Sequence, residues 1–137
     1  MRRVIVDEEV PGISELIEDI KKNKNECGAI CCFIGVVRGL SENERVMKLE
    51  FDSYRELAES KLDEIIEELM EKYGILDIRV AHKIGELYPG EDIIYIVVAS
   101  RHREECFKSV REMIDRLKEE APIWKKEYTE SKEYWVD

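Results

Sequence analysis

Basic side chains gather at both ends of one segment of the sequence that has a helical pattern. The two clusters consist of Arg101, His102 and Arg103 before the segment, and Lys118, Lys125 and Lys126 around its end. Guanidinium and ammonium groups bind phosphates and carboxylates, and a lysine partly removed from water can also move protons or attack an acyl carbon. The sequence therefore predicts a site for an anionic ligand near this segment.

The segment between the two clusters is expected to be an amphipathic helix. Apolar side chains recur with helical spacing at positions 106, 107, 110, 113, 114 and 117, and we expect this face to be buried. Arg103 falls within the apolar arc and Lys118 at its edge. In the alternative interpretation, both cations reach past the apolar stripe to water or pair with carboxylates such as Glu119, and helix ends attract lysines through the dipole alone.

Three further side chains are candidates for chemistry. Arg38 ends an apolar strand and precedes Gly39, which suits a clamp for phosphate or carboxylate, although its position alone favours an ordinary solvated arginine. His102 stands between two arginines at a helix start, where its neutral form is favoured, so it could donate a hydrogen bond or shuttle a proton. A capping or structural role for His102 is an equal alternative. His82, in the middle of a strand, is interpreted as structural.

The overall charge restricts the classes of partner. The 137 residues carry a net charge of −10, which disfavours nonspecific binding to nucleic acid or to anionic membranes. Hydrophobic residues at 44% and charged residues at 39% are typical of one folded domain, here residues 1–137. No apolar run approaches the roughly 20 residues that span a bilayer, and the N-terminus lacks the apolar core of a signal peptide. We therefore expect a cytoplasmic protein.

The four cysteines do not predict a metal site. Cys27, Cys31, Cys32 and Cys106 form no CxxC pair, and adjacent strand residues such as Cys31 and Cys32 point to opposite faces. We expect buried, reduced thiols that act as small apolar side chains. Motifs typical of serine hydrolases, P-loop NTPases, zinc proteases and dinucleotide-binding proteins are also absent from the sequence.

The elements that position these residues alternate between strands and helices. Strands are expected at 2–6, 28–37, 45–54, 76–87 and 92–100, helices after Pro11, at 55–73 and between the basic clusters, and a hairpin after Pro122. The apolar strand 28–37 is expected to be covered on both sides, strand 92–100 to be central, and strand 45–54 to contain a bulge. These elements predict an α+β fold in which three helices cover a mostly antiparallel sheet, with two βαββ-like units and a C-terminal hairpin, similar to an α/β hammerhead.

Four blocks of the sequence occur in an order that is typical of one family. They are GAICCFIGVVRG, HKIGELYPGE, SRHR and LKEEAPIWKKE, accompanied by LEFDSYRELAESKLDEI and a closing YWV. Between about Gly28 and Val136 the chain resembles the catalytic (large) subunit of molybdopterin synthase. The resemblance implies an enzyme that transfers two sulfurs from the C-terminal thiocarboxylate of a small ubiquitin-like carrier subunit, ending in Gly-Gly, onto cyclic pyranopterin monophosphate.

The resemblance also implies roles for the basic residues. Lys118 and Lys125 correspond to the pocket lysines of the family and are expected to be catalytic. Arg38, His102, Arg103 and Lys126 are expected to bind substrate. No metal or redox cofactor is implied, and Phe51-Asp52 replaces the Tyr-Glu that is more usual in the family.

The spacing of the two clusters bears on assembly. Arg103 and Lys118 are 15 positions apart, which on a helix is roughly 22 Å, too far for both to hold one small substrate. We therefore expect a homodimer in which His102 and Arg103 of one chain face Arg38, Lys118 and Lys125 of the other, and the resemblance implies a heterotetramer with two carriers. One alternative is a noncatalytic dimeric module that binds an anionic metabolite. In another, the basic clusters are only surface ion-pair networks.

Overall fold

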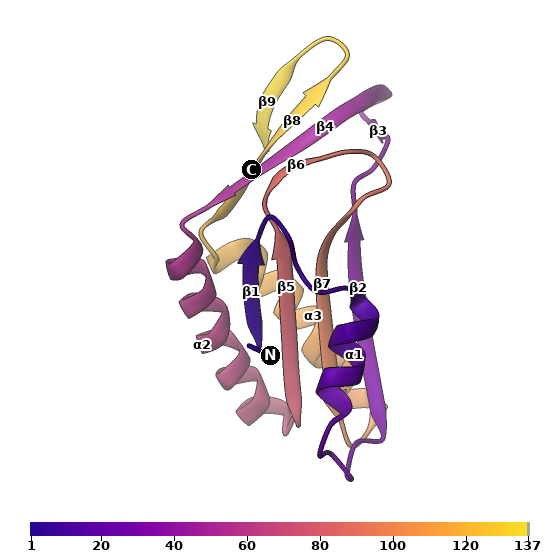
Figure 1. The fold of residues 1–137 in the computed structure, drawn as a ribbon, viewed down its shortest axis with the longest axis vertical. Coiled ribbons are helices and arrows are strands. Elements are labelled where there is room, and N and C mark those ends of the chain that lie inside the picture. Colours follow the sequence, from indigo (N-terminus) through magenta and orange to yellow (C-terminus); the bar gives the residue numbers. More distant parts are fainter. Residues whose placement is uncertain (137) are drawn as a thin grey trace.

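A computed structural model describes residues 1–136 and contains two sheets, one above the other in Figure 1. The elements in chain order are β1 (Val4–Asp7), α1 (Ile13–Lys21), β2 (Ala29–Val36), β3 (Leu40–Ser41), β4 (Glu44–Ser53), α2 (Arg55–Tyr73), β5 (Asp77–Lys83), β6 (Gly85–Leu87), β7 (Asp92–Ser100), α3 (Arg103–Glu120), β8 (Ile123–Thr129) and β9 (Glu133–Val136). The predicted α+β class with three helices and a C-terminal hairpin is confirmed.

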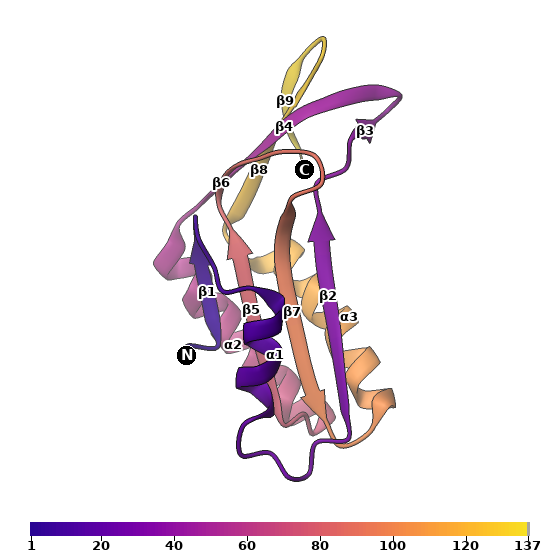
Figure 2. The same cartoon turned by 45° about the vertical axis from the view of Figure 1, so that its right-hand side comes forward.

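The first sheet has the strand order β1-β5-β7-β2 and is covered by helices on both faces. β7 runs antiparallel to β5 and β2, and β1 is parallel to β5. Helix α1 packs on one face, while α2 and α3 lie together on the other (Figure 2). The apolar strand 92–100 is therefore an inner strand, as predicted.

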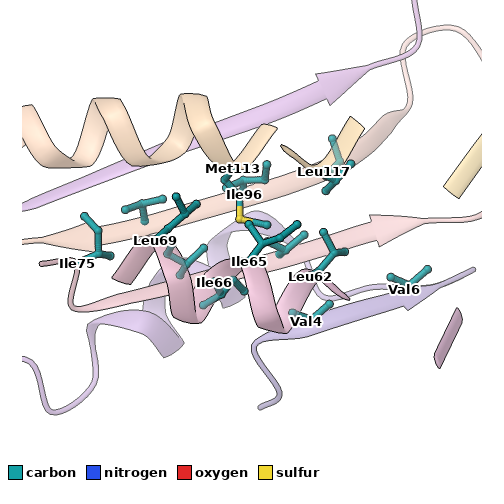
Figure 3. Packing of buried hydrophobic residues seen from close by; sticks show 14 of the residues in the cluster. Val4, Val6, Leu62, Ile65, Ile66, Leu69, Ile75, Ile96, Met113 and Leu117 are labelled. Carbon is teal, nitrogen blue, oxygen red and sulfur yellow. The ribbon is translucent and has the colours of Figure 1, made fainter. Parts of the chain in front are cut away.

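The main core lies between this sheet and the pair α2 and α3. Leu62, Ile65, Ile66 and Leu69 of α2 are fully buried against strand residues and Met113 of α3 (Figure 3). Helix α2 ends at Gly74, whose φ of 65° is left-handed and suits glycine, so the predicted C-cap is confirmed. The packed pair of helices fixes the direction of α3, which carries a basic cluster at each end.

One face of strand β2 is partly exposed, so the expectation that both of its sides are covered was wrong. Within residues 1–136 β2 pairs only with β7, at the edge of the sheet. Helix α3 packs on one face of β2, whereas on the other face α1 lies mainly over β5 and β7. Ile34 and Val36 are consequently 41% and 48% exposed, and Cys32 is exposed rather than buried. An apolar sequence cannot by itself distinguish an inner strand from an edge strand whose outer surface meets another molecule.

The second sheet is built on β4, which pairs with β3, β6 and β8, and β8 continues into β9. The predicted bulge in β4 is present, between Val46 and Lys48. The strand expected at 76–87 divides at Ile84 and Gly85, which has a φ of 95°, and the second part joins β4. This break carries the chain from one sheet to the other.

Helix α3 is buried on a narrower face than the sequence predicted. Cys106, Met113 and Leu117 are buried, but Phe107 is 61% exposed because the next residue on a helix points about 100° away. Arg103, the first residue of the helix, is exposed as well. No helix within residues 1–136 is both long enough and apolar enough to cross a membrane.

Candidate active site

A pocket of about 500 Å³ lies where the end of β2, the end of α3 and the start of β8 meet. Its walls are mostly apolar and include Phe33, Ile114 and Trp124. Three cations line it as well, namely Arg38, Lys118 and Lys125. The structure thus brings together three side chains that are far apart in the sequence and were predicted to share a site.

Lys125 is the most enclosed of the three cations. It is half-buried in β8, and burial, with the nearby charges of Lys118 and Arg38, holds the pKa of its amine below the usual value, while Glu127 acts in the opposite direction. A lowered pKa increases the fraction of neutral amine near neutral pH. Lys125 is therefore suited to accept a proton as well as to hold an anion.

Lys118 and Arg38 are more open to solvent and supply charge at the pocket. Lys118 lies in the last turn of α3, and Arg38 follows β2. Arg116, which lies close to Lys118 in α3, instead forms ion pairs with Glu68 and Glu120. Within residues 1–136 neither Lys118 nor Arg38 forms such an ion pair, so the suggested pairing of Lys118 with Glu119 does not occur there. Both charges are available to an anionic ligand.

Lys126 does not reach this pocket. Its Nζ atom lies 2.9 Å from Glu133 of β9 and also sits over the rings of Tyr128 and Trp135. Successive strand residues point to opposite faces, so a lysine directly after Lys125 must leave the strand on the other side. Lys126, which was predicted to bind substrate, therefore contacts the hairpin instead of lining this pocket.

The other basic cluster lines a separate pocket of about 480 Å³ at the start of α3, together with Gly28 and Ala29. His102 is the N-cap residue but its side chain makes no capping bond, and both His102 and Arg103 are exposed. Arg101 forms an ion pair with Glu26, with 2.8 Å between its Nη2 atom and the carboxylate. His102 and Arg103 are therefore the free basic groups of this pocket in the described residues.

The two pockets lie at opposite ends of β2. Ala29 lines one and Arg38 the other, and the nine positions between them correspond to roughly 30 Å of extended chain. A side chain of Gly28 would meet the carbonyl oxygen of Arg101 at 2.4 Å, which explains the glycine where β2 and the start of α3 approach. One chain thus carries the two predicted halves of a site without joining them.

His82 also lines the first pocket, although the sequence suggested only a structural role. It is 4% exposed, its Nδ1 atom lies 2.7 Å from the carbonyl oxygen of Lys83, and burial lowers the pKa of its imidazole to about 4. In the sequence, the only sign of this role was that a titratable side chain, His82, lies in a strand whose other residues suit full burial. Only the fold reveals that the strand ends against the pocket.

All four cysteines are free thiols. Burial raises the pKa of Cys31 to about 12 and also raises the pKa of Cys32. The Cys106 thiol donates a hydrogen bond to the carbonyl oxygen of Val98 at 3.2 Å. Among residues 1–136 no group of three or more His, Cys, Asp or Glu side chains is arranged to hold a metal ion.

The protein has an α+β fold with a mostly apolar pocket in which three cations converge, an arrangement suited to anionic groups. More particularly, the chain belongs to the MoaE protein family, whose model matches residues 6–120. This match confirms the family predicted from the sequence.

Individual relatives agree with this assignment. The chain is 41% identical over 128 residues to a "Probable molybdopterin synthase" from Haloferax volcanii, covering 90% of this chain and 49% of that protein. It is 36% identical over 121 residues to a "Molybdopterin synthase catalytic subunit" from Ralstonia nicotianae, covering 88% and 69%. The crystal structure of molybdopterin synthase from Staphylococcus aureus superposes with a TM-score of 0.92 at 30% identity, covering 100% and 98% of the two chains. The chain spans about half the length of the Haloferax protein.

Proposed function

We propose that this chain is the catalytic subunit of a molybdopterin synthase. It transfers two sulfurs from the C-terminal thiocarboxylate of a small ubiquitin-like carrier, ending in Gly-Gly, to cyclic pyranopterin monophosphate. Relatives that are 36–41% identical carry the name of this enzyme. The observation that supports the assignment most directly is the convergence of Arg38, Lys118 and Lys125 on one mostly apolar pocket.

The chemistry of the substrates matches this pocket. A thiocarboxylate and a phosphate are both anions, and a pocket that excludes water strengthens their attraction to fixed cations. In each transfer the thiocarboxylate sulfur replaces an oxygen substituent on a carbon of the pterin side chain: the carbon–sulfur bond forms, the carbon–oxygen bond breaks, and the departing oxygen takes up a proton. Water then breaks the bond between the sulfur and the acyl carbon, which leaves a carboxylate on the carrier. Two carriers supply the two sulfurs.

Lys118 and Lys125 have different roles in this reaction. Lys118 binds the carrier terminus and stabilises negative charge that develops on the acyl oxygen. Lys125, whose pKa is lowered by burial and by neighbouring cations, accepts a proton from the attacking water. Arg38 holds the pterin phosphate. No step in this scheme calls on a cysteine, a metal or a redox cofactor of the chain.

The complete site is shared between two copies of the chain. Ile34 and Val36 expose the apolar edge strand β2, which is the kind of surface that a partner covers. If two β2 strands face each other in opposite directions, the start of each lies beside the end of the other. His102 and Arg103 of one copy then help to bind the substrate held by the lysines of the second. With one carrier per site the assembly is a heterotetramer.

The experiment that tests this function is mass spectrometry of cyclic pyranopterin monophosphate after incubation with the chain and a thiocarboxylated carrier. A pterin product that carries two sulfurs in place of oxygen substituents supports sulfur transfer, whereas an unchanged pterin with a bound carrier contradicts it. A noncatalytic dimeric module would instead bind an anionic metabolite without any carrier. We also propose that the chain acts as a single domain in the cytoplasm and binds neither membranes nor nucleic acid, as the net charge of −10 favours.

A further inference from the structure

His82 is a buried ring whose orientation is fixed from two sides. Its Nδ1 atom lies 2.7 Å from the carbonyl oxygen of Lys83, a group that can only accept a hydrogen bond. Nδ1 therefore carries the proton, and in the neutral ring Nε2 is left as an acceptor. The ring also meets Phe51 edge to face, with 5.2 Å between the centroids. These two contacts leave the ring little freedom to turn.

The acceptor atom Nε2 has no hydrogen-bond partner among residues 1–136 and is not fully shielded from solvent. His82 lines the first pocket, and within residues 1–136 its only hydrogen bond is the one made by Nδ1. In residues 1–136, the Ser109 hydroxyl is the only buried polar side-chain atom that is fully shielded from solvent and has no hydrogen-bond partner. Nε2 is consequently neither paired nor sealed off, and a donor in the pocket can reach it.

Lys125 is a donor that the fold places in the same pocket as His82. In the β4–β8 ladder Lys125 is the cross-strand partner of Phe51, and such partners share one face of a sheet. Phe51 in turn packs against the His82 ring. Lys125 and His82 line the same pocket and are close enough for the lysine charge to act on the imidazole.

We propose that His82 is a positioning residue for Lys125, and that its Nε2 atom accepts a hydrogen bond from the lysine ammonium group. The contact itself is a property of the chain alone. Its consequence for sulfur transfer rests on the function proposed above, in which Lys125 must point at the carrier terminus. His82 would then orient a side chain that has four rotatable bonds and no other anchor in the described residues.

A neutral acceptor suits this task better than a carboxylate would. A carboxylate beside Lys125 would strongly stabilise the ammonium form and raise its pKa, whereas a neutral imidazole orients the ammonium group and raises its pKa less. The other groups that act on Lys125 are Lys118 of α3, Arg38 after β2 and Glu127 of β8 itself. Burial keeps the imidazole neutral, so the pair does not become two cations.

The contact is tested by labelling lysines with acetic anhydride at a series of pH values and measuring each modified peptide by mass spectrometry. In the wild type, Lys125 should titrate below Lys126, which is the matched control on the opposite face. His82→Phe keeps a ring and removes the acceptor, so the apparent pKa of Lys125 should fall by about one further unit. His82→Gln offers an amide oxygen near the position of Nε2 and should restore much of the shift.

An unchanged pKa of Lys125 in folded His82→Phe would overturn the proposal. Since this variant alters a buried site, a second measurement starts from the lysine. In ¹⁵N NMR, Lys125→Met should move the His82 Nε2 resonance toward that of an acceptor without a donor, and Lys118→Met should move it much less. A resonance that does not respond to Lys125→Met also overturns the proposal. Neither experiment contains carrier or pterin, so failure of sulfur transfer would be recognised separately.

Discussion

Lys125 and Lys126 are adjacent in β8, but their side chains leave the strand on opposite faces. Lys125 enters the apolar pocket beside Lys118 and Arg38, and Lys126 pairs with Glu133 at 2.9 Å in the C-terminal hairpin. A shift of one residue thus separates a candidate catalytic lysine from one whose ammonium group pairs with Glu133 of the C-terminal hairpin. The two residues form a matched pair for mutagenesis, because they share a strand, a charge and a side-chain length.

Replacing Lys125 by alanine should lower the rate of sulfur transfer by about 100-fold to 10,000-fold, the range typical of a lost general acid or base. Lys126→Ala should stay within about threefold of the wild type, because its contacts lie outside the pocket. Single-turnover assays with thiocarboxylated carrier measure both rates. Equal losses in the two variants would contradict the assignment of Lys125.

Protonation of His82 should make the protein less stable in acid. Its pKa falls from 6.5 to about 4 on folding, so between these values the unfolded chain binds more protons than the folded one. Stability is therefore lost as pH decreases from about 6.5 toward 4, by roughly 3 kcal/mol for this group alone. Urea unfolding at pH 7 and pH 4.5 measures the change. The loss should be much smaller in His82→Phe, and an equal loss in that variant would exclude His82 as its source.

Two inactive variants should restore activity when they are mixed. In a dimer formed by Arg103→Ala and Lys118→Ala chains, one shared site loses both residues and the other keeps both. With random assortment about a quarter of the wild-type sites are intact, so about a quarter of the activity should return. Assays after denaturation and refolding of the mixture, alongside each variant refolded alone, test this. Activity no greater than that of the separate variants would argue for a site within one chain.

Charge on the exposed edge strand should separate the subunits. Ile34→Asp together with Val36→Asp places like charges where two apolar β2 surfaces would otherwise meet, and these charges repel in any register of the two strands. Sedimentation should show monomers for the double variant and dimers for the wild type, with activity lost in parallel. Leu57→Asp is a control, because Leu57 is an exposed apolar residue of α2, away from β2. A double variant that remains dimeric would mean that another surface forms the interface.

Local sequence signals predicted much of the fold. Gly74 indicated the end of α2, the broken alternation after Val46 indicated a bulge, and the turn around Pro89 and Gly90 separated β6 from β7. These features depend on residues close together in the chain, and their physical causes are therefore visible in the sequence. The apolar character of strand 28–37 was visible too, but its place at the sheet edge depends on how distant strands pair.

The candidate site was predictable in part for the same reason. Arg38, Lys118 and Lys125 were named from charge and position, and the fold places them in one pocket. Lys126 was assigned with Lys125 because both belong to one basic run, although strand alternation alone would have separated them. The access of His82 to the pocket depends on the packing of β5 against β4, which no local pattern specifies.

The measurement that tests the central claim most directly is the mass of the pterin after one turnover with thiocarboxylated carrier, compared between the wild type, Lys118→Ala and Lys126→Ala. Our account predicts a product with two added sulfurs for the wild type and for Lys126→Ala, and almost none for Lys118→Ala. Absence of sulfur from the wild-type product, with carrier shown to be bound, would contradict sulfur transfer by this pocket. Full sulfur transfer by Lys118→Ala would contradict the role of its lysine.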